Sequence, residues 1–320
     1  MLDTILAILH MLIFPGGIFA LAVVLFFKGL DRRVAARVQR RVGPPLIQPV
    51  LDIAKLLTKE TLIPKTAHRA AFIMAPVLGF TGMAVCAAFI PVSGVFNGLT
   101  NMGDLLVLFY LLPIPAIALM LGAAASSSTF GSVGFSREML MMLAYEVPLL
   151  AVMLAVAMLV GKGMGGGAEF SLANIIAYQE ANGQLGFNPV MIPAMVAYLI
   201  FLPGTLGVVP FDIPEAETEV LEGPLLEYGG PLLALYHIGS ALKTFVVLGL
   251  GVALFFPGTL CDFAPVNLVW FVVKCFLLML VAVTVVRAST GRFRIDQAFW
   301  FYVKFPTVLS LISLVLVWWM

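Results

Sequence analysis

The chain has 320 residues, of which 62% are hydrophobic and 11% are charged. A soluble globular domain is about 45–50% apolar and about 25% charged, so this composition excludes a soluble single domain and a disordered chain. The formal net charge of +1, from 18 basic and 17 acidic residues, also excludes the strongly basic surface that binds nucleic acid. The composition instead indicates a protein whose main partner is the lipid bilayer.

Eight apolar stretches are long enough to cross a membrane as helices, since about 20 apolar residues span its hydrocarbon core. They lack the alternation of apolar and polar residues that marks the strands of a membrane barrel. The sequence therefore predicts an all-α polytopic membrane protein that forms a single integral membrane domain over residues 1–320. The expected helices cover residues 5–27, 70–92, 105–125, 139–160, 187–209, 232–256, 266–286 and 299–320.

Lysine and arginine are distributed unevenly over the expected connections. Most of the 18 basic residues lie in 28–69, 126–138 and 287–298, which fall on one side of the membrane in an eight-helix topology. Basic connections face the cytoplasm. We therefore expect a multi-pass protein of the cell membrane with both termini outside.

The segment 46–62 is too short to span and has apolar residues at helical spacing. Val50, Ile53 and Leu57 repeat along one face, whereas Lys55 lies on another. A proline near the start suits the first turn of a helix. This pattern predicts an amphipathic helix in the cytoplasmic interface, with an ordinary soluble helix as the alternative.

The loop 210–230 is rich in carboxylates and has no basic residue. Apolar residues and prolines interrupt the acids, as in Pro210–Pro214, so the loop has features that a simply solvated loop does not need. Two interpretations stay open: a solvated acidic loop, or a charged vestibule where this loop meets the basic segment 28–69. The acids are Asp212, Glu215, Glu217, Glu219, Glu222 and Glu227.

Ionisable residues inside the expected spans are the strongest functional candidates. A charge near the bilayer centre costs roughly 2.5–3.5 kcal/mol on insertion scales, so such residues are rare unless they have a role. Glu146, Lys243 and Lys274 lie within spans, and Lys304 is close enough to a helix end to reach the interface. The first three are predicted to form a relay whose members set one another's charge.

The chain has few side chains that hold redox cofactors. Cys86, Cys261 and Cys275 are widely spaced, and an iron–sulfur cluster usually takes four thiolates. His10 and His237 are expected at opposite membrane faces, which argues against haem. No nucleophilic triad, phosphate loop or metal cage is apparent. We therefore expect no cofactor in this chain and a non-catalytic role within any oxidoreductase complex.

Several motifs follow one another in order along nearly the whole chain. Residues 36–44 read A-R-V-Q-R-R-V-G-P, and residues 210–217 read P-F-D-I-P-E-A-E. These segments resemble the A-R-x-Q-x-R-x-G-P signature and the P-F-D-L-P-E-A-E loop of the H subunit of complex I, the membrane subunit beside the quinone site. Further matches are Gln48–Pro49, Tyr145–Glu146, Glu227–Tyr228 and Arg292–Gln297.

The resemblance implies an eight-helix subunit that receives a hydrophilic redox arm on its cytoplasmic face. The residues expected at the interface with this arm are Arg37, Gln39, Arg41, Asp52, Lys55, Asp212, Tyr228, Arg292, Arg294 and Asp296. The residues expected in an ion or proton pathway are Glu146, Glu215, Glu217, Glu219, Glu222, Glu227, Lys243 and Lys274.

Three departures favour one branch of the family, the energy-converting group 4 nickel–iron membrane-bound hydrogenases. The segment after Gly43 is short, residues 222–228 are similar to the E-G-P-L-x-E-Y form of the hydrogenases, and Ser240 stands where quinone-reducing members usually have a carboxylate. This branch implies hydrogenase-like large and small peripheral subunits, an iron–sulfur subunit and antiporter-like membrane subunits. The iron–sulfur clusters and the nickel–iron site would lie in those partners.

The expected function is to couple ferredoxin-driven hydrogen evolution in the arm to translocation of protons or sodium ions. The first alternative is the quinone-site subunit of an NADH:quinone oxidoreductase, with Tyr228 and the acidic loop near the headgroup. A stand-alone ion transporter is a second alternative, although the chain shows no clear repeat of broken helices. A passive scaffold is the third.

Overall fold

The computed structural model describes residues 10, 12–96, 98 and 105–320. The only extended pairing in this part of the chain is an isolated bridge between Val92 and Phe96. The main helices are α2 (Gly17–Val38), α3 (Gln48–Leu57), α4 (Arg69–Phe89), α5 (Leu105–Leu111), α6 (Ile114–Ala125), α7 (Thr129–Gly163), α8 (Leu172–Asn182), α9 (Ile192–Thr205), α11 (Gly230–Phe255), α12 (Ala264–Met279), α13 (Val285–Ser289), α14 (Ile295–Lys304) and α15 (Pro306–Trp319).

The expected all-α polytopic membrane fold is confirmed. Among the described residues, six helical segments are long and apolar enough to cross a membrane. They are Arg69–Phe89, Leu105–Ala125, Thr129–Gly163, Gly230–Phe255, Ala264–Ser289 and Ile295–Trp319. These six correspond to six of the eight expected spans. The other two expected spans correspond to α2 and α9.

The helix boundaries differ from the expected ones at three places. Helix α2 continues to Val38, so the first part of the basic segment 28–69 is helical, and residues 5–9 of the expected span 5–27 lie outside the described residues. Helix α9 has only 14 residues, whereas the expected span was 187–209. Helix α7 begins at Thr129, so most of the expected connection 126–138 belongs to a 35-residue helix.

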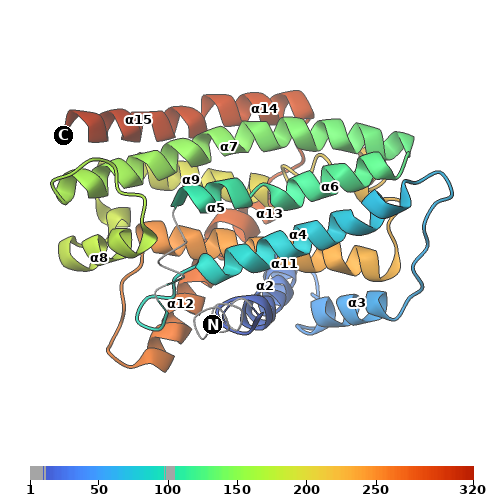
Figure 1. The fold of residues 1–320 in the computed structure, drawn as a ribbon, viewed down its shortest axis with the longest axis horizontal. Helices are drawn as coiled ribbons and strands as arrows, with labels where there is room; N and C mark the ends of the chain where they lie inside the picture. The colour runs from blue at the N-terminus through green and yellow to red at the C-terminus, as the bar shows by residue number, and fades with distance from the viewer. Residues whose placement is uncertain (1–9, 11, 97, 99–104) are drawn as a thin grey trace.

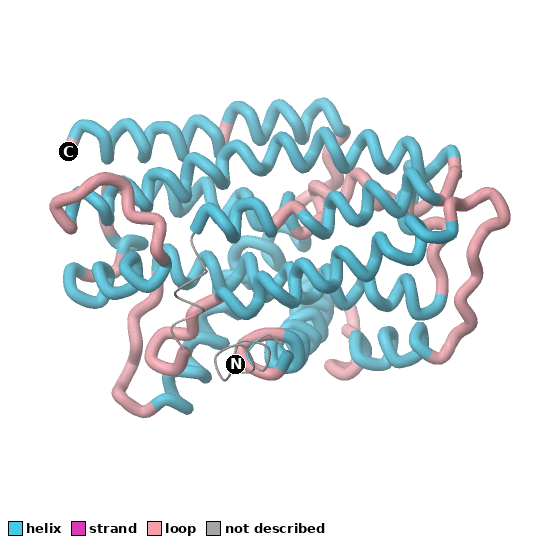
Figure 2. The backbone as a smooth tube through the Cα atoms, in the orientation of Figure 1, coloured by secondary structure: helices cyan, strands magenta, loops and turns pink. Residues whose placement is uncertain are grey.

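The long helices lie side by side around a large buried apolar core, and a smaller apolar cluster that includes Phe72 and Tyr228 lies beside it. Helix α11 packs against α2, α3, α4 and α12, and α7 packs against α6, α9 and α15. Figure 1 shows α4, α6, α7 and α15 running in similar directions, with α3 at one end of the molecule and α8 and the C-terminus at the other. The long loop between α3 and α4 and the loop between α7 and α8 mark these two ends in Figure 2.

Proline sets the start of many of these helices. It occupies the first or second helical position in α3, α6, α9, α11, α12 and α15. The backbone nitrogen there needs no intrahelical acceptor, and the fixed φ of proline already suits the helix. Helix α3 is shorter than the expected 46–62, and its large apolar residues Val50, Leu51 and Leu57 are exposed, as an interfacial helix requires.

Two glycines allow the segment after α9 to pack closely against the helices. A Cβ atom at Gly134 of α7 would overlap the ring of Pro224, and one at Gly122 of α6 would overlap the hydroxyls of Tyr228 and Tyr236. Only glycine permits such close contact. The acidic loop is thereby held against α6 and α7, with one of its carboxylates turned into the bundle.

Candidate functional site

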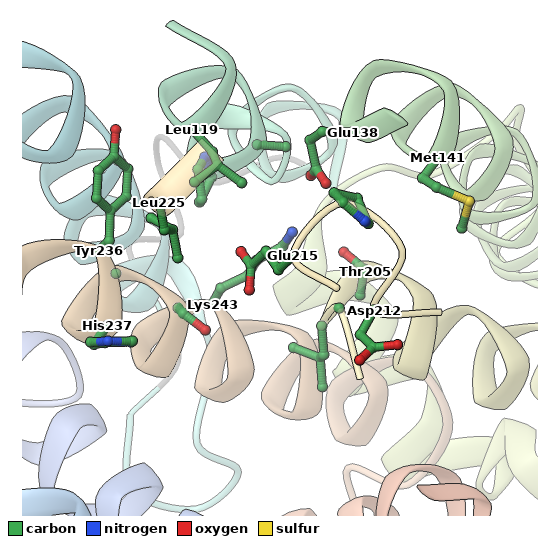
Figure 3. Close-up of a pocket in the computed structure, with 18 of the residues that line it drawn as sticks. Leu119, Glu138, Met141, Thr205, Asp212, Glu215, Leu225, Tyr236, His237 and Lys243 are labelled. Atoms are coloured by element: carbon green, nitrogen blue, oxygen red, sulfur yellow. The ribbon is translucent and has the colours of Figure 1, made fainter. Parts of the chain in front are cut away.

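A cavity of about 110 Å³ lies where α4, α6, α7 and α11 meet the loop after α9. The polar side chains on its wall are Glu138 from α7, Thr205, Asp212 and Glu215 from the end of α9 and the acidic loop, and Tyr236, His237, Ser240 and Lys243 from α11. Figure 3 shows the side chains of Glu215 and Lys243 close to each other in the middle of the view, with Glu138 above them. The rest of the wall is largely apolar.

The charged groups around this cavity are close without being paired. Lys243 is only 7% exposed, although a lysine is almost never buried to that extent without a partner. Among the described residues, no nitrogen of Lys243 lies within 4.0 Å of a carboxylate oxygen of Glu138 or Glu215. The cation and the two carboxylates therefore interact across the cavity, where water or a small cation fits between them.

The ionisation of Glu215 depends strongly on its surroundings. Burial among protein atoms, and next the negative charge of Glu138, raise the pKa of Glu215 to about 7, against the opposing influence of Lys243 and Lys28. The Glu215 side chain nevertheless remains accessible to solvent, because it lines the cavity. Near neutral pH this carboxyl is poised between its protonated and ionised forms.

A second group of polar atoms extends from Lys243 along α7. The ammonium of Lys243 lies 5.7 Å from the centre of the Tyr145 ring, in reach of a cation–π interaction. Tyr145 follows Glu138 at i+7 and so shares its helix face. Within the described part of the chain, Tyr145 Oη and the neighbouring Glu146 Oε1 are buried and have no hydrogen-bond partner. Such atoms are uncommon in proteins and often belong to functional sites.

Two ion pairs fix the acidic loop to the helices. Arg292 donates from Nε to Asp212 Oδ1 at 2.8 Å and from Nη2 to Asp212 Oδ2 at 2.5 Å, and its third nitrogen contacts Thr218 Oγ1. Arg137 of α7 pairs with Glu219 and also reaches the Ile213 carbonyl oxygen at 3.4 Å. These contacts hold both ends of residues 212–219, and so they place Glu215 at the cavity.

The expected pathway carboxylates are thus not gathered in one vestibule. Glu215 faces the cavity, Glu219 is paired with Arg137, Glu217 and Glu222 are exposed, and Glu227 is half-buried. Lys274, also expected in the pathway, lies apart from the cavity lining. Its ammonium donates hydrogen bonds to the carbonyl oxygens of Phe256 and Gly258 at 2.6 and 2.9 Å, which ties the loop after α11 to α12.

Several residues expected at the arm interface have partners within the chain. Asp212 and Arg292 bind each other, and Asp52 binds Arg32 at 3.0 Å. Tyr228 is 5% exposed, stacks on Phe72 and donates to the Phe72 carbonyl oxygen, so it lies in the interior rather than on a docking surface. The expected interface residues that are exposed are Arg37, Gln39, Arg41, Lys55, Arg294 and Asp296.

Two polar features of the structure have only faint signals in the sequence. Glu138 falls in the expected connection 126–138, but the structure shows that it is helical. It lies seven residues before Tyr145 and therefore on the same face of α7, and this spacing is the only sequence signal that connects it with the site. Asp31 is 8% exposed and accepts from Thr284 Oγ1 at 2.7 Å and Arg287 Nη1 at 2.9 Å, which joins α2 to the end of the seventh expected span. Asp31 and Thr284 are 253 residues apart in the sequence, so no local pattern predicts their contact.

No group of three or more His, Cys, Asp or Glu side chains among the residues described here is arranged to hold a metal ion. The site instead consists of separated carboxylates, a buried ammonium and aromatic hydroxyls around a small cavity. Together, the fold and the site define a polytopic membrane protein with ionisable groups inside its helical bundle. Such an arrangement can exchange protons or hold a small cation.

Comparisons with known proteins identify the family. The chain belongs to the family described as NADH dehydrogenase, whose model matches residues 10–318. The H subunit of the NADH-quinone oxidoreductase of Dehalococcoides mccartyi is 30% identical over 96% of this chain and 86% of that protein. One of the H subunits of Rhodopseudomonas palustris, the one numbered 2, is 33% identical over 91% of this chain and 89% of that protein.

A solved structure extends the likeness to the whole fold. A chain of the membrane-bound sulfane sulfur reductase, an archaeal respiratory membrane complex, is 29% identical and has a TM-score of 0.87, with 99% of this chain and 100% of that chain covered. The resemblance to the H subunit of complex I is therefore confirmed. The chain is a multi-pass membrane subunit of a complex I-like respiratory complex.

Proposed function

We propose that this subunit couples electron transfer in a docked peripheral arm to movement of protons or sodium ions through the membrane. The observation that carries the proposal is the convergence of Lys243, Glu138 and Glu215 on one cavity without an ion pair. A change in the charge or position of one member alters the pKa values of the others, because the charges interact across the cavity. A modest change is enough, since a shift of one pKa unit corresponds to only 1.36 kcal/mol.

The acidic loop links the two processes in this proposal. Its outer residues are exposed at the surface, and Glu215 reaches inward from the same loop. A redox-driven shift in an arm docked on the loop would move Glu215 relative to Lys243. Tyr145 and Glu146 then offer the next polar atoms along α7. Antiporter-like membrane subunits would receive the resulting change in charge.

The distribution of basic residues supports the orientation proposed for the subunit in the cell membrane. In this proposal the arm side faces the cytoplasm and both termini lie outside, an orientation that the basic connections and the amphipathic helix α3 support. Exposed basic residues at this side include Arg37 and Arg41, which remain our proposed contacts for the arm.

For the arm itself we favour a hydrogenase-like set of subunits, with ferredoxin as the donor and iron–sulfur clusters and a nickel–iron site in the partners. The neutral Ser240 and the E-G-P-L-L-E-Y sequence of residues 222–228 support this branch. The full-length match to a chain of the sulfane sulfur reductase supports a non-quinone acceptor equally well, so that reductase is the first alternative. The relatives named as H subunits of NADH-quinone oxidoreductase favour a quinone-site subunit as the second candidate.

A Glu138→Gln variant of the intact complex, reconstituted in vesicles, tests the coupling function. Electron transfer is expected to continue, while cation uptake per electron pair falls about tenfold. This factor corresponds to a change of one unit in the pKa of the neighbouring carboxyl, Glu215, when the charge of Glu138 is removed. Glu180→Gln is the matched control, because Glu180 is exposed on α8 at the opposite end of the molecule. Equal uptake in the Glu138→Gln and unsubstituted complexes would contradict the proposal.

The same preparation distinguishes the three kinds of arm. Hydrogen evolution from reduced ferredoxin supports the hydrogenase-like arm, and sulfide formation from a sulfane substrate supports the reductase. Inhibition of electron transfer by a quinone analogue counts against both and favours the quinone-site subunit.

A further inference from the structure

A second cavity, of about 280 Å³, lies between α2, the interfacial helix α3 and α11. Its wall divides into an apolar part and a charged part. The apolar part consists of Leu25 from α2, Pro49, Ile53 and Leu56 from α3, and Leu233 from α11. The charged part consists of Lys28, Arg32, Asp52, Lys55 and Lys59, with His237 beside them. An amphiphilic ligand matches such a division.

The charged part has an excess of cations that the chain itself does not neutralise. Its one carboxylate, Asp52, is bound by Arg32 at 3.0 Å and by Gln48 at 2.9 Å. Burial alone would raise the pKa of Asp52, but these hydrogen bonds outweigh burial and leave its pKa below the ordinary value. Asp52 therefore stays ionised and already paired.

The three lysines in the charged part of the wall, Lys28, Lys55 and Lys59, form no ion pair with an acidic residue among the described residues. Within the described part of the chain, the side chain of Lys28 donates one hydrogen bond, to the Ser240 hydroxyl at 3.4 Å. Lys55 and Lys59 are exposed at the end of α3, whereas Lys28 is half-buried at the inner side of the cavity. The three ammonium groups thus surround the opening at different depths.

We propose that this cavity binds an anionic phospholipid, with the phosphate among Lys28, Lys55 and Lys59 and the first part of an acyl chain against the apolar wall. Basic pockets between membrane helices on the cytoplasmic side recognise lipid headgroups through charge. Phosphate oxygens accept charge-assisted hydrogen bonds from several cations at once. Helix α3 lies in the interface where such headgroups are found, and its exposed apolar residues continue the same surface.

A zwitterionic headgroup such as that of phosphatidylcholine fits the charged part less well. Its own quaternary ammonium offsets the charge of its phosphate, so the repulsion among the three lysines is less fully neutralised. An acidic lipid removes this repulsion and also fills the apolar part of the cavity. The proposal goes beyond the coupling function, because it concerns a lipid ligand of the second cavity, although Lys28 also lowers the pKa of Glu215 across the short distance between the two cavities.

Photo-crosslinking in the intact complex tests the proposal. The complex is placed in phosphatidylcholine nanodiscs that contain a trace of photoactivatable phosphatidylglycerol or, separately, phosphatidylcholine with the same photoactivatable chain. We expect phosphatidylglycerol to label peptides from 48–59 and 231–237, and phosphatidylcholine not to label them. A Lys55→Gln/Lys59→Gln double variant should weaken this labelling about 25-fold, or about fivefold for each lysine near the membrane surface.

The matched control is Lys65→Gln/Arg69→Gln, which removes two exposed basic residues of the same segment outside the cavity. Its labelling should equal that of the unsubstituted complex. Equal labelling by the two lipids would overturn the proposal, as would full labelling in the Lys55→Gln/Lys59→Gln variant. Displacement of phosphatidylglycerol by millimolar glycerol 3-phosphate would indicate a site for soluble phosphate instead, and displacement by a quinone analogue would indicate a quinone site.

Discussion

A Lys243→Met variant is expected to assemble, to transfer electrons and to lose cation translocation. Methionine keeps the length and apolar stem of the side chain and removes the 7%-exposed ammonium. Folding should tolerate the change, because replacing a buried charge by an apolar group of similar volume also removes its desolvation cost. Glu138 and Glu215 would then face one cavity without a cation.

The physical reason is the effect of Lys243 on its neighbours. Lys243 lowers the pKa of Glu215, so its removal raises that pKa further above the ordinary value. A rise of one unit reduces the ionised fraction of Glu215 about tenfold at pH values well below its pKa. Cation uptake per electron pair in vesicles should therefore fall by up to about tenfold.

Lys304→Gln is the control for this variant, since Lys304 is another basic residue of the membrane region but is exposed beside Trp300, away from the cavity. It should leave uptake unchanged. If Lys243→Met complexes translocated as many cations per electron pair as the unsubstituted complex, Lys243 would have no place in the pathway.

An Asp212→Ala variant is expected to release the acidic loop from the helices. It removes both acceptors of the Arg292 fork and leaves a half-buried guanidinium unpaired. Hydrogen bonds to charged groups contribute about 1.5–3 kcal/mol, and the partial exposure of this pair puts the expected loss of local stability at about 2 kcal/mol. Amide hydrogen exchange in residues 212–228 should accelerate about 30-fold in the intact complex.

Two further variants give this prediction its controls. Asp296→Ala removes an exposed carboxylate four residues along the chain from Arg292 and should leave exchange in the loop unchanged. Arg292→Lys keeps the charge but loses the two-pronged geometry, so it should give an intermediate acceleration. Exchange in the loop that is the same in Asp212→Ala and unsubstituted complexes would show that this pair does not anchor the loop.

The long apolar helices can be predicted from composition, because burial in lipid demands about 20 apolar residues in a row. The ends of these helices are harder to predict. A change from apolar to charged residues marks where a helix leaves the lipid, but it does not mark the end of a helix that continues beyond the membrane. The helical turns from Thr129 to Glu138 and from Lys28 to Val38 lie in such regions. Their residues are polar enough for a loop, and packing against neighbouring helices decides their conformation.

The site is predictable where burial in lipid singles out a residue. Lys243 stands alone in an apolar run, so the cost of placing its charge in the membrane already indicates a role. Glu138 carries no such signal, because it precedes the apolar part of α7. Glu215 is indistinguishable by sequence from the other acids of its loop, since only the contacts of Asp212 and Glu219 determine which carboxylate turns inward.

Infrared difference spectroscopy of the intact complex, recorded on reduction at a series of pH values, tests most directly whether a cavity carboxylate follows electron flow. With a pKa of about 7, Glu215 is mostly protonated at pH 6 and mostly ionised at pH 8, unlike an ordinary glutamate, which is ionised at both. We predict a protonated-carboxyl band that changes on reduction, most strongly near pH 7, and that is lost in Glu215→Gln. Identical difference spectra from Glu215→Gln and unsubstituted complexes would contradict coupling through this carboxylate.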